Sequence, residues 1–296
     1  MKPSPLKYHR ASSVADVLER LHNDPDAKVL AGGQSLMPML NFRLARVSEL
    51  IDVGGLGELD RIFDDVDSVI IGARCTHRRL ETDQVIARVN PLLRHAASQI
   101  GYITIRNRGT LGGSIAHADS AAELPAVLVA MDATIYVDRH LDARREVPAR
   151  EFFESHFTTV LEPADLVTWI RVPAVRASSG WGFREIAPRH GDMATAGAVA
   201  VMHTSAGRVT SAYGALFGVT DRPTGFAVPQ LLGCPSSTDR EDANAMIDDA
   251  VALITAELRP TWDAALRRRY AKACLGTALR DAFDRSGGIP VRPAHR

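Results

Sequence analysis

The alternation of apolar and polar positions divides the chain into three successive units. In the first unit, the apolar spacing predicts a helix over residues 14–22 and short strands over residues 28–30 and 49–53. Residues 34–46, which contain Pro38, predict a short helix or an ordered loop between the strands. The first unit is therefore expected to be a compact β-x-β arrangement.

The second unit begins with a hairpin pattern over residues 59–72, whose turn contains Asp64, Asp65 and Asp67. Helical spacing follows over residues 77–88, 91–100 and 123–131, and strand patterns cover residues 134–137 and 165–172. This unit is expected to end near Pro173.

The third unit follows a small, polar, turn-forming segment, residues 175–180, which is the best candidate linker in the chain. Residues 196–203 and 209–218 form a hairpin pattern, and two long helical patterns, 240–258 and 262–283, complete the chain. A small antiparallel sheet backed by helices is expected, with a poorly ordered tail after Ser286.

Composition favours neither nucleic acid nor an anionic membrane as a partner. Apolar residues make up 46% and charged residues 24%, and 35 Lys and Arg balance 35 Asp and Glu. The Arg267–Arg269 run lies in a helical pattern and is interpreted as a solvated face. No apolar run approaches the ~20 residues that span a bilayer, so there is no integral membrane segment and any membrane contact would be peripheral.

The three cysteines, Cys75, Cys234 and Cys274, are widely spaced and form no Cys-x-x-Cys pair. No zinc or iron–sulfur site is therefore expected here, and any such cluster must belong to another chain. The odd cysteine count and a start without the apolar stretch of a signal peptide predict a cytoplasmic location.

Two glycine-rich segments carry the candidate chemistry. Residues 31–36 directly follow an apolar strand, and glycine permits the positive φ angles with which successive N–H groups converge on an anion. Residues 110–114 repeat this pattern and add the hydroxyls of Thr110 and Ser114. Either segment alone could be a turn without a ligand. As a pair on separate subdomains, they predict a ligand as long as a dinucleotide.

Other nucleotide signatures are absent from the sequence. It contains no G-x-x-x-x-G-K-[ST], and the glycines Gly54, Gly55 and Gly57 are followed by Asp60 where a third fingerprint glycine belongs. A P-loop ATPase and a Rossmann-type dinucleotide-binding domain are therefore excluded.

Several polar residues near the second segment allow two interpretations each. Arg106 and Arg108 are either surface charges or a source of positive potential near phosphates. His117 fits a packed or solvent-facing histidine better than a catalyst. Asp119 and Glu123 could accept hydrogen bonds from ribose or adenine, or could cap a helix.

Three sequence motifs, in a fixed order, resemble motifs of the FAD-binding medium subunits of molybdenum hydroxylases. These are AGGQSLMP at 31–38, IRNRGTLGGSIAHAD at 105–119 and AELP at 122–125. Residues 183–192 look like the start of that family's C-terminal domain, and the likeness extends to about residue 285. The group includes the carbon monoxide dehydrogenase, quinoline oxidoreductase and nicotine dehydrogenase types, and is related to the flavin domain of xanthine dehydrogenase.

The resemblance implies an α+β fold in two domains. A two-subdomain FAD-binding domain of the vanillyl-alcohol-oxidase (PCMH) type is expected over residues 1–175, divided near residue 56. A small C-terminal domain with an antiparallel sheet and helices is expected over residues 178–288.

The resemblance also implies which residues contact FAD, and it implies no catalytic residue and no metal on this chain. Ser114 stands where many relatives have Asn, Glu123 where many have Asp, and Arg184 where Lys is frequent; all three keep a polar contact available. With Asp119 added as a hydrogen-bond acceptor, the expected contacts are Val29, Leu30, Ala31, Gly32, Gly33, Gln34, Ser35, Leu36, Ile100, Thr110, Leu111, Gly112, Gly113, Ser114, Asp119, Glu123, Val167 and Arg184.

In function, the resemblance implies an electron-relaying subunit. In such complexes a large molybdopterin subunit hydroxylates the substrate, a small subunit carries two [2Fe-2S] clusters, and FAD on the medium chain collects the electrons for an external acceptor. Residues 113–119 look more like the branch that acts on nitrogen heterocycles. The assembly is expected to be a heterotrimer or a dimer of heterotrimers.

Two other functions are compatible with the sequence. A self-sufficient flavin oxidase would need convergent polar groups in the third unit, where Arg189, His190, Asp192 and Tyr213 are the candidates. A non-enzymatic assembly protein would have lost the cofactor, but the intact glycines argue against it, because without a ligand their backbone freedom is an uncompensated entropic cost.

Overall fold

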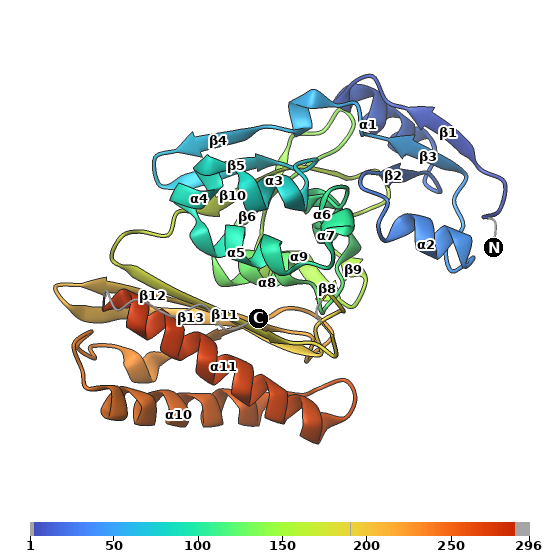
Figure 1. Cartoon of the computed structure of the whole chain (residues 1–296). Coiled ribbons are helices and arrows are strands. Elements are labelled where there is room, and N and C mark those ends of the chain that lie inside the picture. Colours follow the sequence, from blue (N-terminus) through green and yellow to red (C-terminus); the bar gives the residue numbers. More distant parts are fainter. Residues whose placement is uncertain (1–2, 190, 288–296) are drawn as a thin grey trace.

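The computed structural model describes residues 3–189 and 191–287, and it shows a mixed α+β fold in which sheets and helices alternate in layers (Figure 1). The predicted tail after Ser286 falls mostly on residues 288–296, which lie outside the described residues. The predicted domain boundaries stay a prediction, although each predicted unit contains its own sheet.

The first unit is the expected β-x-β arrangement with one additional strand. The parallel strands β2 (Lys28–Leu30) and β3 (Glu49–Asp52) pair directly, and β1 (Lys7–Arg10), which the sequence pattern did not reveal, adds to the other edge of β3. Helix α1 (Val14–Asn23) packs Val17, Leu18 and Leu21 into the core of this unit. The helix α2 (Leu36–Asn41) lies between β2 and β3 in sequence.

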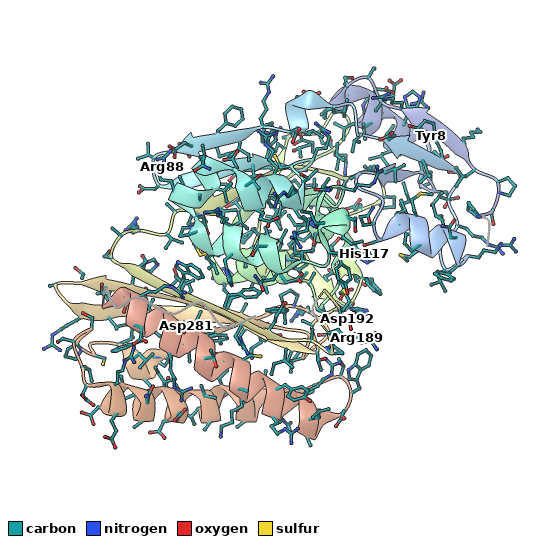
Figure 2. The ribbon with its side chains drawn as sticks, in the orientation of Figure 1. Tyr8, Arg88, His117, Arg189, Asp192 and Asp281 are labelled. Carbon is teal, nitrogen blue, oxygen red and sulfur yellow. The ribbon has the colours of Figure 1, made fainter. Side chains whose placement is uncertain are left out.

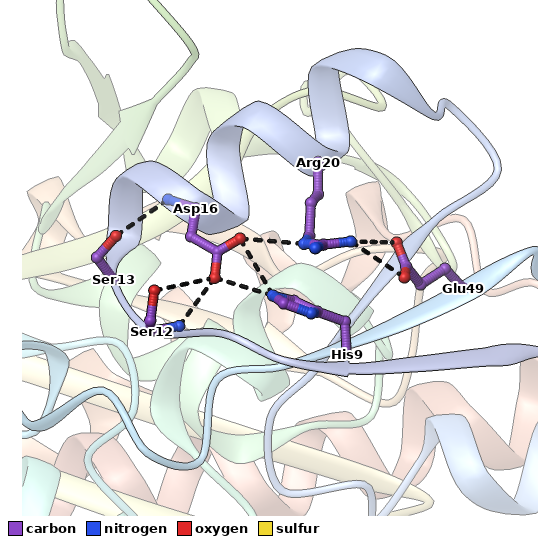
Figure 3. A network of polar contacts seen from close by, with 6 residues as sticks. All are labelled: His9, Ser12, Ser13, Asp16, Arg20 and Glu49. Atoms are coloured by element: carbon purple, nitrogen blue, oxygen red, sulfur yellow. Dashed lines mark hydrogen bonds and ion pairs between the residues drawn. The ribbon is translucent and has the colours of Figure 1, made fainter.

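A polar network ties α1 to its sheet (Figure 3). The Asp16 carboxylate bonds His9 Nε2 at 2.9 Å and accepts from Arg20 Nε at 3.0 Å, and Arg20 also pairs with Glu49 at 3.2 Å. Ser13 caps the helix by accepting from the Asp16 amide. The hydrogen bond with His9 and that from the Ser12 amide hold the pKa of Asp16 well below its usual range.

The second unit is built on a five-stranded antiparallel sheet in the order β4-β5-β10-β6-β7. Its bounds are β4 (Ile62–Asp65), β5 (Ser68–Gly72), β6 (Thr134–Asp138), β7 (Arg145–Pro148) and β10 (Leu166–Pro173). The predicted hairpin and the two later strands are confirmed, whereas β7 and the small hairpin of β8 (Phe153–Ser155) and β9 (Thr158–Thr159) were missed.

Helices cover the face of this sheet that is turned toward the third unit (Figure 1). They are α3 (His77–Thr82), α4 (Gln84–Val89), α5 (Pro91–Gln99), α6 (Ile103–Arg106), α7 (Leu111–His117), α8 (Glu123–Ala130) and α9 (Ala149–Phe152). The single helix predicted over residues 77–88 is wrong, because extended backbone at Asp83 ends α3, and the Asp83 side chain accepts from the Val85 and Ile86 amides to start α4.

The third unit is a four-stranded antiparallel sheet in the order β11-β12-β13-β14. Its bounds are β11 (Ser179–Ile186), β12 (Ala196–Ser205), β13 (Arg208–Phe217) and β14 (Thr224–Ala227). Helices α10 (Arg240–Glu257) and α11 (Ala264–Ser286) cover its outer face, as predicted (Figure 1). The predicted linker is shorter than expected, because β11 already begins at Ser179.

The core of the second unit extends into the inner face of the third. Phe183, Val199, Val201, Ala215 and Phe217 belong to the same buried apolar cluster as the helices α5 and α8. The opposite face of that sheet packs on α11, where Gly180 and Gly182 meet the carbonyls of Ala282 and Ala278. The second and third units are therefore joined by a continuous apolar core.

Candidate functional site

The first glycine segment, residues 31–36, presents backbone amides that the protein does not use. It runs from the end of β2 to the start of α2, and Gly33 has a φ of +73°. Within the described residues, the amides of Gly33, Gln34, Ser35 and Leu36 donate to no protein acceptor. All four residues are partly exposed. This row of unpaired N–H donors is suited to an anion.

The second segment, residues 110–114, differs from the prediction. It is the beginning of the helix α7, and the Thr110 hydroxyl caps that helix by accepting from the Gly113 amide at 3.1 Å. The amides of Leu111, Gly112 and Ser114 donate to the carbonyls of Cys75, Ala73 and Thr110. The expectation of a second turn with free amides is therefore wrong, because the helix and the neighbouring loop already satisfy them.

The two segments nevertheless lie against each other. A Cβ atom on Gly32 would stand 2.2 Å from the Arg108 carbonyl oxygen and 2.8 Å from the Gly109 Cα. One on Gly113 would lie 3.9 Å from the Ala31 Cβ. Glycine at position 32 is thus required by a close approach of two backbones, and the structure confirms that the segments meet across two units.

The two arginines of the second segment have different environments. Arg106 is largely buried, pairs with Glu81 at 3.0 Å, and donates to the carbonyls of Ile100 and Gly101. Arg106 therefore holds the backbone of Ile100 and Gly101 in place, and Glu81 offsets its positive charge. Arg108 is exposed beside the first segment and is the arginine better placed to add positive potential there.

A pair of buried carboxyl groups lies between the second and third units. Glu123 begins α8 and is 9% exposed, and burial, with the nearby Glu185, raises the pKa of its carboxyl to about 8. Burial also raises the pKa of Glu185 to about 7, and its Oε2 atom has no hydrogen-bond partner within the described residues. Glu185 was not among the predicted site residues, because only the strand register shows that it lies on the inner face.

Arg184 lies on the other face of β11. Gly182 and Gly180, two and four residues earlier, pack on α11, whereas Phe183 belongs to the inner core. Alternation along the strand therefore places Arg184 on the α11 side. Its charge acts on Cys274 and Asp281 of α11. The structure therefore does not bring Arg184 together with the glycine segments.

The other predicted contacts take mainly structural positions. Asp119 accepts from the Ala121 amide at 2.8 Å in a turn before α8 and does not cap that helix, whose N-cap, Ala122, has no side-chain cap. Val167 is a core residue, and Ile100 is partly buried against the same core. His117 packs its ring on Phe157 with centroids 4.7 Å apart, so it is a packed histidine.

The polar groups that a self-sufficient oxidase would need do not converge. Tyr213 lies on β13 opposite Val201 and bonds His203 Nε2 at 2.7 Å, whereas Arg189 and Asp192 lie beyond the opposite end of β11. Figure 2 shows Arg189 and Asp192 on the same side of the molecule as His117. There the loop approaches the second unit, because a Cβ on Gly191 would stand 2.9 Å from the Tyr102 ring. His190 lies outside the described residues.

These observations fit a dinucleotide such as FAD. The free amides of residues 33–36 match a pyrophosphate, and the glycines leave room for its close approach. The unpartnered Glu185 oxygen can accept a hydrogen bond, and the buried Glu123 can both donate and accept one. Fold and site together are those of a protein suited to bind a nucleotide at the contact between its first two units.

Comparison with known proteins identifies the family. The sequence profile described as "FAD binding domain in molybdopterin dehydrogenase" matches residues 4–175. The chain belongs to this family, the FAD-binding medium subunits of molybdenum hydroxylases, whose members are oxidoreductase subunits.

The relatives extend this likeness over the whole chain. The sequence is 34% identical over 296 residues to caffeine dehydrogenase subunit beta of Pseudomonas sp. (strain CBB1), covering 99% of each chain. It is 42% identical over 203 residues to the 6-hydroxypseudooxynicotine dehydrogenase complex subunit alpha of Paenarthrobacter nicotinovorans, covering 68% of each. The crystal structure of quinoline 2-oxidoreductase from Pseudomonas putida 86 matches with a TM-score of 0.88 and 34% identity, covering 96% of this chain and 99% of that one.

Residues 3–189 and 191–287 contain neither a membrane-spanning helix nor a metal-ligand cluster. No helix there is long and apolar enough to cross a membrane. No group of three or more His, Cys, Asp or Glu side chains there is arranged to hold a metal ion, and the three cysteines are free and buried.

Proposed function

We propose that this chain holds FAD between its glycine segments and relays electrons from the [2Fe-2S] clusters of a partner subunit to an external acceptor. The observation that carries the proposal is the row of unpaired amides at residues 33–36, backed by the Arg108–Gly109 backbone. Because these residues are partly exposed, water can bond the amides in the free protein, and an anionic ligand can take the place of that water as their acceptor.

Each part of the site has its own task under this proposal. Residues 29–36 would hold the pyrophosphate, and residues 110–114 would form the adjoining wall. Glu123, whose raised pKa keeps it protonated at neutral pH, can both donate and accept a hydrogen bond toward the cofactor. When bound, FAD supplies the redox chemistry, and the protein positions it and tunes it electrostatically. No general acid or base is assigned to this chain.

The partners follow from the family. We propose a small subunit with two [2Fe-2S] clusters and a large molybdopterin subunit, assembled as a heterotrimer or a dimer of heterotrimers in the cytoplasm. Relatives are named as complex subunits or medium chains, which supports a multi-subunit assembly. The names caffeine dehydrogenase and quinoline 2-oxidoreductase support a nitrogen heterocycle as the substrate of the complex, which the large subunit would bind.

The test of FAD binding is a matched pair of glycine substitutions in the full chain. Gly33 and Gly207 have φ angles of +73° and +71°, so valine strains both backbones similarly, at a cost of at least ~1–2 kcal/mol each. Gly207 lies in the β12–β13 turn with no atom within 4 Å of an added Cβ, far from the glycine segments in sequence.

We expect Gly33→Val to abolish FAD retention and Gly207→Val to preserve it. The measurement is the visible absorbance of flavin in the purified chain before and after incubation with excess FAD, with folding checked by circular dichroism. Equal flavin occupancy in both variants would overturn the assigned site. A folded wild-type chain that takes up no FAD, alone or with its co-purified partners, would overturn the function.

The partner assignments need a separate experiment. Affinity purification from the native host, followed by mass identification of co-purified chains, should recover an iron–sulfur and a molybdopterin subunit. Turnover of a small molecule by the purified chain alone would instead favour the self-sufficient oxidase.

A further inference from the structure

His77 is a buried histidine that the proposed electron relay does not use. It is the first residue of α3, is 6% exposed, and follows the loop after β5. Its backbone amide donates to the Gly109 carbonyl at 2.9 Å, and Thr76 forms an isolated bridge with Thr110. The backbone contacts alone thus fix position 77 to the second glycine segment.

The imidazole adds a contact that fixes its own protonation state. Nε2 lies 3.1 Å from the Thr110 carbonyl oxygen, which can only accept, so Nε2 carries the proton and donates. Nδ1 is buried without a partner within the described residues. A neutral ring with one N–H toward Thr110 is the arrangement that these contacts permit.

The ring also sets how closely Gly109 approaches. A Cβ on Gly109 would stand 2.9 Å from both Nδ1 and Cε1 of His77. The Arg108 carbonyl, immediately before Gly109, is the atom against which Gly32 packs. A continuous series of contacts therefore runs from His77 through residues 108–110 to the first glycine segment.

We propose that His77 is a positioning residue of the cofactor site, which holds residues 108–110 at the distance that the first glycine segment requires. Thr110 is the residue whose hydroxyl caps α7, so the His77 hydrogen bond orients both the cap and the wall next to Gly32. The inference rests on the proposed FAD function, but His77 itself lies outside the predicted FAD contacts. It assigns His77 no contact with the cofactor and no proton transfer.

The acid sensitivity of this arrangement follows from the same contacts. Burial, together with the nearby Arg106 of α6, lowers the pKa of His77 to about 4, and Glu81 of α3 pairs with that arginine. A protonated ring would add a donor at Nδ1, where no acceptor lies within the described residues. The packing of the ring on Gly109, which lies beside Nδ1, is therefore expected to weaken as the pH approaches about 4, where His77 in the folded state takes up a proton.

The test compares His77→Leu with His77→Gln in the full chain. Leucine fills much of the ring volume but removes the donor, whereas the glutamine side-chain amide can place an N–H near the position of Nε2. FAD affinity is measured by flavin fluorescence titration at neutral pH, and the unfolding midpoint of each apo-protein is measured alongside. We expect His77→Leu to raise the Kd for FAD about tenfold, the effect of one net hydrogen bond, and His77→Gln to stay within about threefold of wild type.

A pH series covers the case in which the leucine variant does not fold. Wild-type affinity for FAD should fall as the pH approaches 4, and His77→Gln should lose part of that fall, because it removes the titrating ring but leaves His117 and other groups in place. Wild-type affinity in a folded His77→Leu, equal weakening in the leucine and glutamine variants, or identical pH profiles for wild type and His77→Gln would each overturn the proposal. Failure of the wild type to bind FAD at any pH would instead refute the proposed function.

Discussion

Substitution of Gly32 by alanine tests the contact between the two glycine segments most directly. The added Cβ would stand 2.2 Å from the Arg108 carbonyl oxygen, 2.7 Å from its carbon and 2.8 Å from the Gly109 Cα. The nearest of these lies more than about 1 Å inside an ordinary contact distance. All three obstacles are backbone atoms, so no side-chain rotation relieves the overlap, and one segment must move.

The size of the effect follows from the cost of overpacking. An extra methyl in a filled site costs about 1–3 kcal/mol. If the displacement separates the segments, the same free energy raises the Kd for FAD by roughly 5–150-fold. A smaller part of it will lower the free energy of unfolding of the apo-protein.

Gly57→Ala is the matched control, because an added Cβ at Gly57 meets no atom within 4 Å. FAD affinity is measured by fluorescence titration and stability by urea unfolding of the same preparations. Gly32→Ala with wild-type affinity and wild-type stability would falsify the claim that the segments are in contact.

Two further predictions concern buried carboxyl groups. The first concerns Glu123, whose carboxyl has a raised pKa of about 8 in the folded state. Between about pH 4.5 and 8 the folded state therefore binds more protons than the unfolded state. The free energy of unfolding of the wild type should thus fall as the pH rises through this range, and Glu123→Gln tests this. The glutamine variant should flatten that profile, by up to ~5 kcal/mol across the range, while Glu151→Gln at an exposed position leaves it unchanged. Equal profiles for wild type and Glu123→Gln would contradict the burial of this carboxyl. Asp165→Asn should cost about 2 kcal/mol in thermal or urea unfolding, because the fully buried carboxylate accepts from Arg139 at 2.8 Å and Arg145 at 2.5 Å. It should leave the Kd for FAD within about threefold of wild type, and an unchanged unfolding midpoint would show that the two ion pairs contribute little.

The sequence by itself determined many of the local elements and indicated the family. Apolar periodicity located α1, the β4–β5 hairpin and the helices α10 and α11, because these elements bury one face against a core. The ordered strings at 31–38 and 105–119 indicated an FAD-binding medium subunit, and the comparisons confirmed that membership.

Only the tertiary structure decided how the site is built. Short edge strands such as β1 and β7 leave little periodicity to detect, and they form because neighbouring strands complete their hydrogen bonds. The two glycine segments look alike in sequence, yet one has free amides while the amides of the other are satisfied by α7 and the loop after β5. Strand register alone separates Glu185 from Arg184, and the contact of Gly109 with His77 joins residues 32 positions apart. These distinctions arise from long-range packing, which no local pattern of residues encodes.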